Sequence, residues 1–63
     1  MTYEREMAES YRARAKQLRA IADADREPKT AATLRSVAST YDQMADTLDQ
    51  IDRANQSTRK PSN

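Results

Sequence analysis

Two stretches of this 63-residue chain repeat one spacing of apolar residues, and that spacing limits the fold more than any other feature. Apolar side chains recur every three or four residues from residue 8 to residue 22, and again from residue 31 to residue 51. This interval keeps them on one side of an α-helix and is typical of helices that pack together. Pro28 lies between the two stretches and favours the start of a second helix, because proline has no N–H to donate. The sequence therefore predicts an all-α fold, an antiparallel helical hairpin.

The hairpin is expected to occupy residues 1–55. Its predicted segments are a first helix at about 3–24, a turn at about 25–27, a second helix at about 28–54, and a flexible polar tail at 56–63. Asp25 is the expected cap of the second helix, since a carboxylate can accept hydrogen bonds from free backbone N–H groups. A single helix kinked at Pro28 is the alternative, because the chain has no Gly to mark the break.

The heptad positions also predict how the helices pair. In this pattern Ala occupies the a positions, and Tyr or Leu occupies the d positions of both helices. Antiparallel pairing with one Ala and one large residue in each layer places Ala15 beside Tyr41. The same register pairs Arg12 with Asp42 and Arg5 with Asp49, and sets Arg19 against Arg35. Each exposed ion pair is expected to contribute only ~0–1 kcal/mol, so the charges select the pairing more than they stabilise it.

The apolar stripe is wider than a lone hairpin needs, because apolar residues also occupy most g positions. Among the hydrophobic residues eleven are Ala, which leaves twelve large side chains for a core. Cores of chains below roughly 70–80 residues rarely supply more than ~3–5 kcal/mol. Two hairpins are therefore predicted to form a homodimeric four-helix bundle. The expected core and dimer interface are Met7, Tyr11, Leu18, Ile21, Leu34, Val37, Tyr41, Met44, Leu48 and Ile51.

Several classes of function lack their residues. The chain has no Cys, no His and no Gly, which removes thiolate and imidazole chemistry and glycine-rich phosphate loops. No cofactor, metal site or catalytic residue is expected, and the protein is predicted not to be an enzyme. Asp42, Asp46 and Asp49 share one helix side and are interpreted as an exposed acidic face. No apolar run approaches the ~18 residues of a membrane span, and no signal peptide is visible, so a cytoplasmic location is expected.

The leading functional hypothesis is a non-enzymatic protein-interaction module, a small homodimeric adaptor or regulator. The second hypothesis is an RNA- or DNA-binding regulator, because residues 4–19 carry a net charge of +2 while residues 30–53 carry −2. Its expected nucleic-acid face consists of Arg5, Arg12, Lys16 and Arg19. The near-neutral whole chain and the absence of exposed aromatics for base stacking favour the first hypothesis. A subunit that folds only on a larger protein is the third.

Two strings of the sequence, YRARAKQLRAIAD and LRSVASTYDQMADTLDQ, support a resemblance. They resemble a family of small, uncharacterised helical-hairpin proteins of alphaproteobacteria, which repeat RA-x-x-L/C-R-x-[LI]-A and L-x-x-[LV]-A-x-x-[YW]-[DE]-x-[LM]-A. The resemblance covers residues 11–48 and implies the hairpin, but no activity. In architecture alone, the predicted dimer is similar to plasmid copy-number regulators of the repressor-of-primer kind. No sequence match carries the RNA-contacting residues of those regulators onto this chain.

Overall fold

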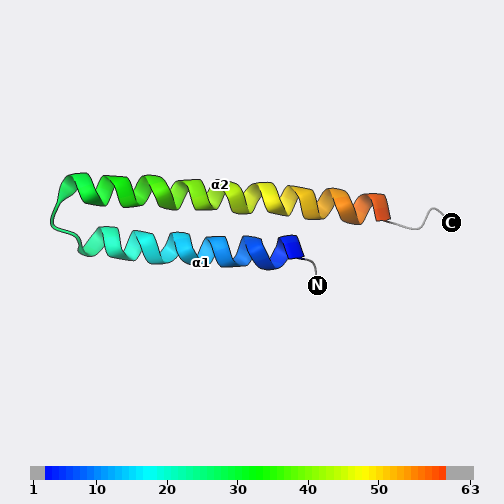
Figure 1. The fold of residues 1–63 in the computed structure, drawn as a ribbon, viewed down its shortest axis with the longest axis horizontal. Helices are drawn as coiled ribbons and strands as arrows, with labels where there is room; N and C mark the ends of the chain where they lie inside the picture. Colours follow the sequence, from blue (N-terminus) through cyan, green and yellow to red (C-terminus); the bar gives the residue numbers. More distant parts are fainter. Residues whose placement is uncertain (1–2, 60–63) are drawn as a thin grey trace.

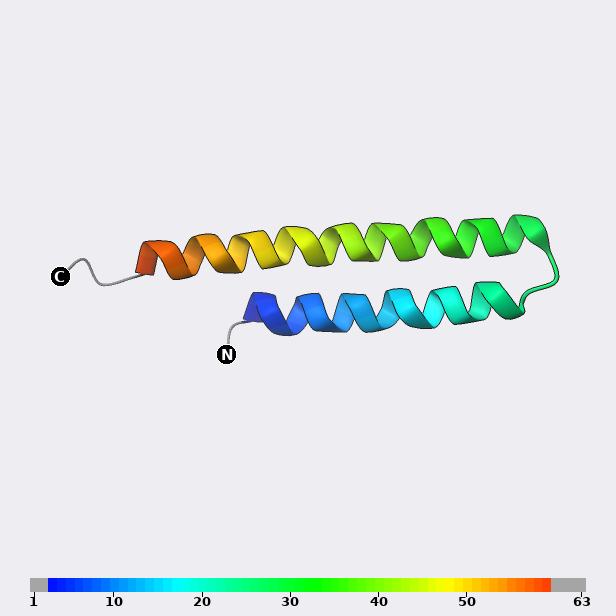
Figure 2. The same cartoon turned by 180° about the vertical axis from the view of Figure 1, so that it is seen from behind.

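The computed structural model describes residues 3–59, which form two long helices joined by a short turn (Figure 1). Helix α1 spans Tyr3–Ala24 and helix α2 spans Pro28–Arg59. The two helices run antiparallel and lie side by side along the whole of α1, as both views show (Figure 2). The predicted all-α hairpin is confirmed, and the single helix kinked at Pro28 is wrong.

Three hydrogen bonds, each donated by a backbone N–H, stabilise the turn. The Asp25 N–H donates to the Ala22 carbonyl at 3.2 Å and closes the last turn of α1. The Glu27 N–H donates to Oδ1 of Asp25 at 2.8 Å, and the Ala31 N–H donates to the Glu27 carbonyl at 2.9 Å as the first bond of α2. Asp25 therefore stabilises the turn itself. It is not the expected cap of the second helix, because the N–H that it binds belongs to Glu27, which precedes the start of α2 at Pro28.

Helix α2 is longer than the sequence indicates. It ends at Arg59, past the expected end at about residue 54, so residues 56–59 of the expected tail are helical. Residues 60–63 of that tail lie outside the described residues. No Gly or Pro stands between Pro28 and Pro61 to stop the helix. With 32 residues against 22 in α1, α2 outreaches its partner helix by about 15 Å (Figures 1 and 2).

The centre of the hairpin consists of alanine. Six Ala residues are at most 5% exposed: Ala8, Ala15, Ala22, Ala31, Ala38 and Ala45. Within the described residues no large apolar side chain is fully buried. Because each helix is covered by the other alone, the two alanine columns face each other and permit a close approach of the backbones. The large apolar side chains are displaced to the edges of this narrow seam.

The short turn also sets the register, which differs from the expected one. Tyr11 and Tyr41 each lie fifteen residues from Arg26, and their ring centroids are 5.5 Å apart. A three-residue turn forces residues equidistant from Arg26 to lie level with one another. The expected layer of Ala15 with Tyr41 is therefore wrong, and like d positions meet across the hairpin.

Candidate functional site

The heptad pattern divides the hairpin into two flanks on either side of the alanine seam. On each helix the d and g positions lie to one side of a, and the e and b positions lie to the other. We name the first side the apolar flank; its apolar residues are Met7, Tyr11, Leu18, Ile21, Leu34, Val37, Tyr41, Met44, Leu48 and Ile51. The charged residues Glu4 and Arg14 also occupy d and g positions on this flank. We name the second side the ion-pair flank; it consists of Arg5, Arg12, Asp23, Arg19, Arg35, Asp42, Asp46 and Asp49, with Asp52 at its end.

The apolar flank is only partly covered by its own chain. Its d residues are half-buried, whereas four of its g residues are exposed by 39–54%: Ile21, Val37, Met44 and Ile51. A groove of about 410 Å³ opens between the helices toward the start of α1 and is lined by Met7, Tyr11, Met44 and Leu48, among others. All ten residues expected to form the core and interface thus lie on this flank or beside it. None of them fills the centre of the hairpin, which is alanine.

An aromatic and cationic stack marks the middle of the apolar flank. The rings of Tyr11 and Tyr41 pack at 5.5 Å with planes tilted by 41°. The guanidinium carbon of Arg14 lies 6.0 Å from the centre of the Tyr41 ring, within the range of a cation–π contact. Arg14 is the single charged residue among the g positions of the described helices. A partner that covers this flank meets a positive charge near its centre.

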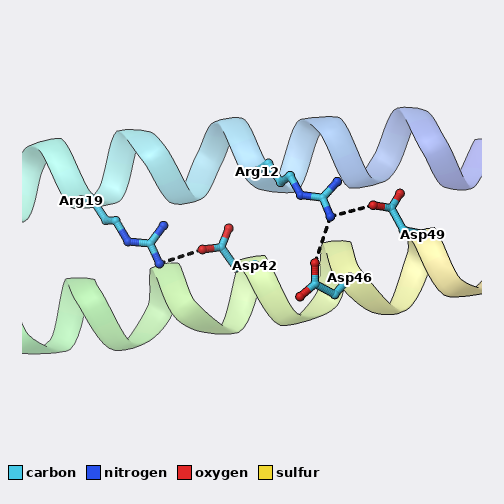
Figure 3. Close-up of polar contacts among 5 residues, drawn as sticks. All are labelled: Arg12, Arg19, Asp42, Asp46 and Asp49. Carbon is cyan, nitrogen blue, oxygen red and sulfur yellow. Dashed lines mark hydrogen bonds and ion pairs between the residues drawn. The ribbon is translucent and has the colours of Figure 1, made fainter.

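The ion-pair flank joins α1 to α2 along its length (Figure 3). Nη2 of Arg12 lies 2.7 Å from Oδ2 of Asp49 and 3.0 Å from Oδ1 of Asp46. Nη2 of Arg19 lies 2.7 Å from Oδ2 of Asp42. The predicted use of Arg on one helix and Asp on the other is confirmed, but the predicted partner of Arg12 is wrong.

The partners differ because side chains on a helix lean toward its N-terminus. In an antiparallel pair the side chains of the two helices therefore lean in opposite directions. As a result Arg12 contacts aspartates that lie at least one helical turn farther from the connecting turn than the α2 residue level with Arg12. Arg5 likewise approaches Asp52, at 3.9 Å, and not Asp49. The expected mismatch of Arg19 with Arg35 does not occur.

The pairing of Arg35 completes this flank near the turn. Its Nη2 lies 2.7 Å from Oδ1 of Asp23, while Arg19 is bound to Asp42. Each arginine thus has its own carboxylate, and like charges are kept apart. The predicted pairing did not include Asp23, although its carboxylate lies on the same side of α1 as Arg19.

Asp52 is the residue of this flank that sequence reasoning missed. It occupies the next a position after Ala31, Ala38 and Ala45 and is 4% exposed. Its Oδ2 accepts a hydrogen bond from the Gln56 amide at 3.2 Å and lies 3.9 Å from Arg5. A continued heptad count would have found it, since a carboxylate there breaks an otherwise constant alanine column.

The expected nucleic-acid face is not a free cationic surface. Arg5, Arg12 and Arg19 all contact aspartates of α2, and Lys16 alone among the four has no ion pair within the described residues. Hydrogen bonds to Asp49 and then Asp46 raise the pKa of Arg12 above its usual value. Phosphate groups would have to compete with these carboxylates for the same guanidinium groups. The expected absence of an exposed aromatic is wrong, because Tyr3 is 70% exposed.

The acidic residues do not form a cation site either. Within the described residues no three acidic side chains gather to hold a metal ion, because Asp42, Asp46 and Asp49 point to arginines. A second groove, of about 440 Å³, lies on this flank between Arg5, Arg12, Asp49 and Asp52 and is lined by charges of both signs. Its charges compensate one another and favour no ligand of one sign.

Comparisons with known proteins add no relative. No protein-family model, no curated protein and no solved structure matches this chain. The resemblance to alphaproteobacterial hairpin proteins therefore stays a prediction. Neither described helix combines the length and the apolar character needed to cross a membrane.

Proposed function

We propose that this protein is a non-enzymatic interaction module that acts as a homodimer, with two hairpins joined through their apolar flanks as a four-helix bundle. One observation carries the proposal: the centre of the hairpin is alanine, while the large apolar side chains lie half-buried or exposed along a single flank. Association would bury the side chains that the chain itself leaves in contact with water, at roughly 25 cal/mol per Å² of apolar surface.

The distribution of charge supports a second copy as the occupant. The apolar flank bears few charges, so two copies can approach through it without a row of like charges meeting. The ion-pair flank, by contrast, satisfies its charges within one chain. A bundle of two hairpins would keep the charged flanks in water and available to other proteins, as an adaptor or regulator requires.

Sedimentation equilibrium tests this proposal, and we expect a mass of about twice 7.2 kDa at micromolar concentration. Met44→Glu places a charge in the exposed centre of the apolar flank. It should shift the equilibrium toward monomer by tenfold or more, because a buried and unpaired carboxylate is costly. Helix content measured by circular dichroism should recover at high protein concentration.

Ser36→Glu is the matched control, since Ser36 is exposed on the side of α2 that faces away from the apolar flank. It introduces the same charge and should leave the association constant unchanged. A cooperatively melting monomer for the unaltered chain would contradict the proposal. A chain that becomes helical only when a larger protein is added would favour the third hypothesis, a subunit of a complex.

A further inference from the structure

Two charged residues stand on the apolar flank, and neither has an ion-pair partner within the described residues. Arg14 occupies a g position, and Glu4 occupies a d position where it is half-buried. They have opposite signs, but ten residues of helix separate them by about 15 Å, which is too far for an ion pair. A second copy of the chain can bring them together.

We propose that Arg14 pairs with Glu4 of the partner subunit in a dimer whose turns lie at opposite ends. This inference rests on the homodimer proposed above and specifies its geometry. A two-fold axis crossing α1 near Glu9 would place each Arg14 beside the partner's Glu4, because Glu9 lies midway between the two residues. Two symmetric ion pairs would then lie on either side of the axis.

The spacing of the exposed residues of α2 indicates, independently of the charges of α1, an axis at the same height along the hairpin. Its exposed g residues Val37, Met44 and Ile51 are evenly spaced, so an axis near Met44 sets Val37 against the partner's Ile51 and Met44 against its own copy. Residues equidistant from Arg26 lie level across the hairpin, as Tyr11 and Tyr41 do. By that rule Glu9 lies level with residue 43, next to Met44. The charges of α1 and the apolar column of α2 therefore define one axis.

The length of α2 agrees with this position. The axis near Met44 passes through the middle of α2, which spans Pro28–Arg59. The end of α2 that projects past α1 in Figures 1 and 2 would then lie over the turn end of the partner hairpin. There it would cover the side chain of Leu34, which is half-buried in the single chain.

Two other symmetric arrangements do not bring Arg14 beside the partner's Glu4. With both turns at the same end, α1 faces α2 of the partner and every residue lies level with its own copy, so about ten residues of helix separate Arg14 from the level of the partner's Glu4. With turns at opposite ends and the axis at the middle of α1, Arg14 lies at the axis and meets the partner's Arg14. Like charges in a partly desolvated interface are unfavourable, and no other acidic residue of the described helices occupies a d or g position beside Arg14.

Cysteine cross-linking distinguishes the three arrangements, and the chain has no native Cys to interfere. Single variants Val37→Cys, Ile51→Cys and Met44→Cys are treated with a short bismaleimide, alone and in equimolar mixtures. We expect cross-linked dimer from Met44→Cys alone and from Val37→Cys mixed with Ile51→Cys. Val37→Cys alone should give none, since about 21 Å of helix separates it from its own copy.

Other patterns overturn the inference. Cross-linking of Val37→Cys alone would show the axis at the middle of α1, because Arg14 lies level with residue 38. A dimer in sedimentation that gives no cross-link from any of these variants or mixtures would show turns at the same end, where α2 faces α1 of the partner. Both results would leave the homodimer intact. A monomer in sedimentation would refute the homodimer and this inference together.

Charge variants test the ion pair itself. Arg14→Gln should weaken association about three- to thirtyfold in 0.05 M salt, because two exposed-to-half-buried pairs are lost. Arg14→Glu should weaken it further by setting two carboxylates together, and Arg14→Glu combined with Glu4→Arg should restore it. Lys16→Gln, which removes the same charge from an exposed position off this flank, is the control and should have no effect. Tighter association of Arg14→Gln would indicate that Arg14 meets its own copy and would refute the pairing.

Discussion

The two flanks of this hairpin share one alanine seam but differ in how far a single chain satisfies them. On the ion-pair flank, Arg12, Arg19 and Arg35 each find a carboxylate of the opposite helix within 3.0 Å. On the apolar flank, Ile21 and Ile51 stay exposed by 54% and 43%. The single chain pairs the charges of the first flank, whereas it leaves large apolar side chains of the second flank exposed to water.

This difference follows from the strength and reach of the two kinds of contact. Exposed ion pairs contribute only ~0–1 kcal/mol each, so they select one pairing of helices without holding it firmly. Apolar contacts supply most of the stability of small domains, but here alanine at the centre offers little surface to bury. We therefore propose that charges help to select the pairing of the two helices and that association supplies much of the stability.

The largest expected effect comes from removing a large side chain on the apolar flank. Leu48 is half-buried in the single chain and lines the groove beside Met7 and Met44. Leu48→Ala should lower the free energy of unfolding by about 2–5 kcal/mol when a second hairpin covers the residue, because a cavity is left in the interface. Chemical denaturation at several protein concentrations measures this loss. A small loss that does not vary with concentration would mean that the flank is never covered.

The alanine seam should respond to added volume by a somewhat smaller amount. Ala15→Leu inserts a branched side chain where the helices approach closely, and should cost about 1–3 kcal/mol by forcing them apart. Ala13→Leu makes the same substitution at an exposed position of α1 and is the matched control. Thermal melts of the two variants are compared directly. Equal melting temperatures would show that the helices are not in alanine contact.

Much of this fold could be predicted from the sequence. The spacing of apolar residues and Pro28 predicted both helices and the turn, because helix period and proline sterics are local properties. The predicted register was wrong, because it was derived from matching Ala with a large residue in each layer, whereas a three-residue turn places Tyr11 level with Tyr41. The end of α2 was missed because residues 56–59 are polar, although no Gly or Pro among them breaks the helix.

The geometry of the candidate site differs from the sequence-based expectation. The ten apolar residues were identified by heptad position, yet their place beside the seam and not at its centre follows from the small size of alanine. Arg5 and Arg12 were expected opposite aspartates and Arg19 opposite Arg35, but the lean of side chains along a helix moved each partner by about one to two turns. Asp52 shows the same limit, because its burial depends on where α1 begins relative to α2.

The smallest expected effect comes from the ion-pair flank. Arg19 and Asp42 have side chains 45% and 38% exposed, so water and salt screen their attraction. Arg19→Gln should therefore lower the free energy of unfolding by less than about 1 kcal/mol in 0.05 M salt, and by less still in 1 M salt. Urea denaturation of Arg19→Gln, Asp42→Asn and the double variant measures the coupling between the two residues.

The effect of the ion pairs on the register of the two helices can be measured separately from their effect on the free energy of unfolding. Loss of Arg19 alone should change the unfolding midpoint slightly, since Arg12 and Arg35 still hold the two helices in register through their own carboxylates. Replacing Arg12, Arg19 and Arg35 together by Gln removes every described pair except that of Arg5 with Asp52. If charges select the pairing of the helices, this triple variant should keep its helix content but no longer adopt a single register. The NMR signals of the Tyr11 and Tyr41 rings would then be broadened. Sharp and unshifted ring signals would mean that the turn and the alanine seam set the register without help from the ion pairs.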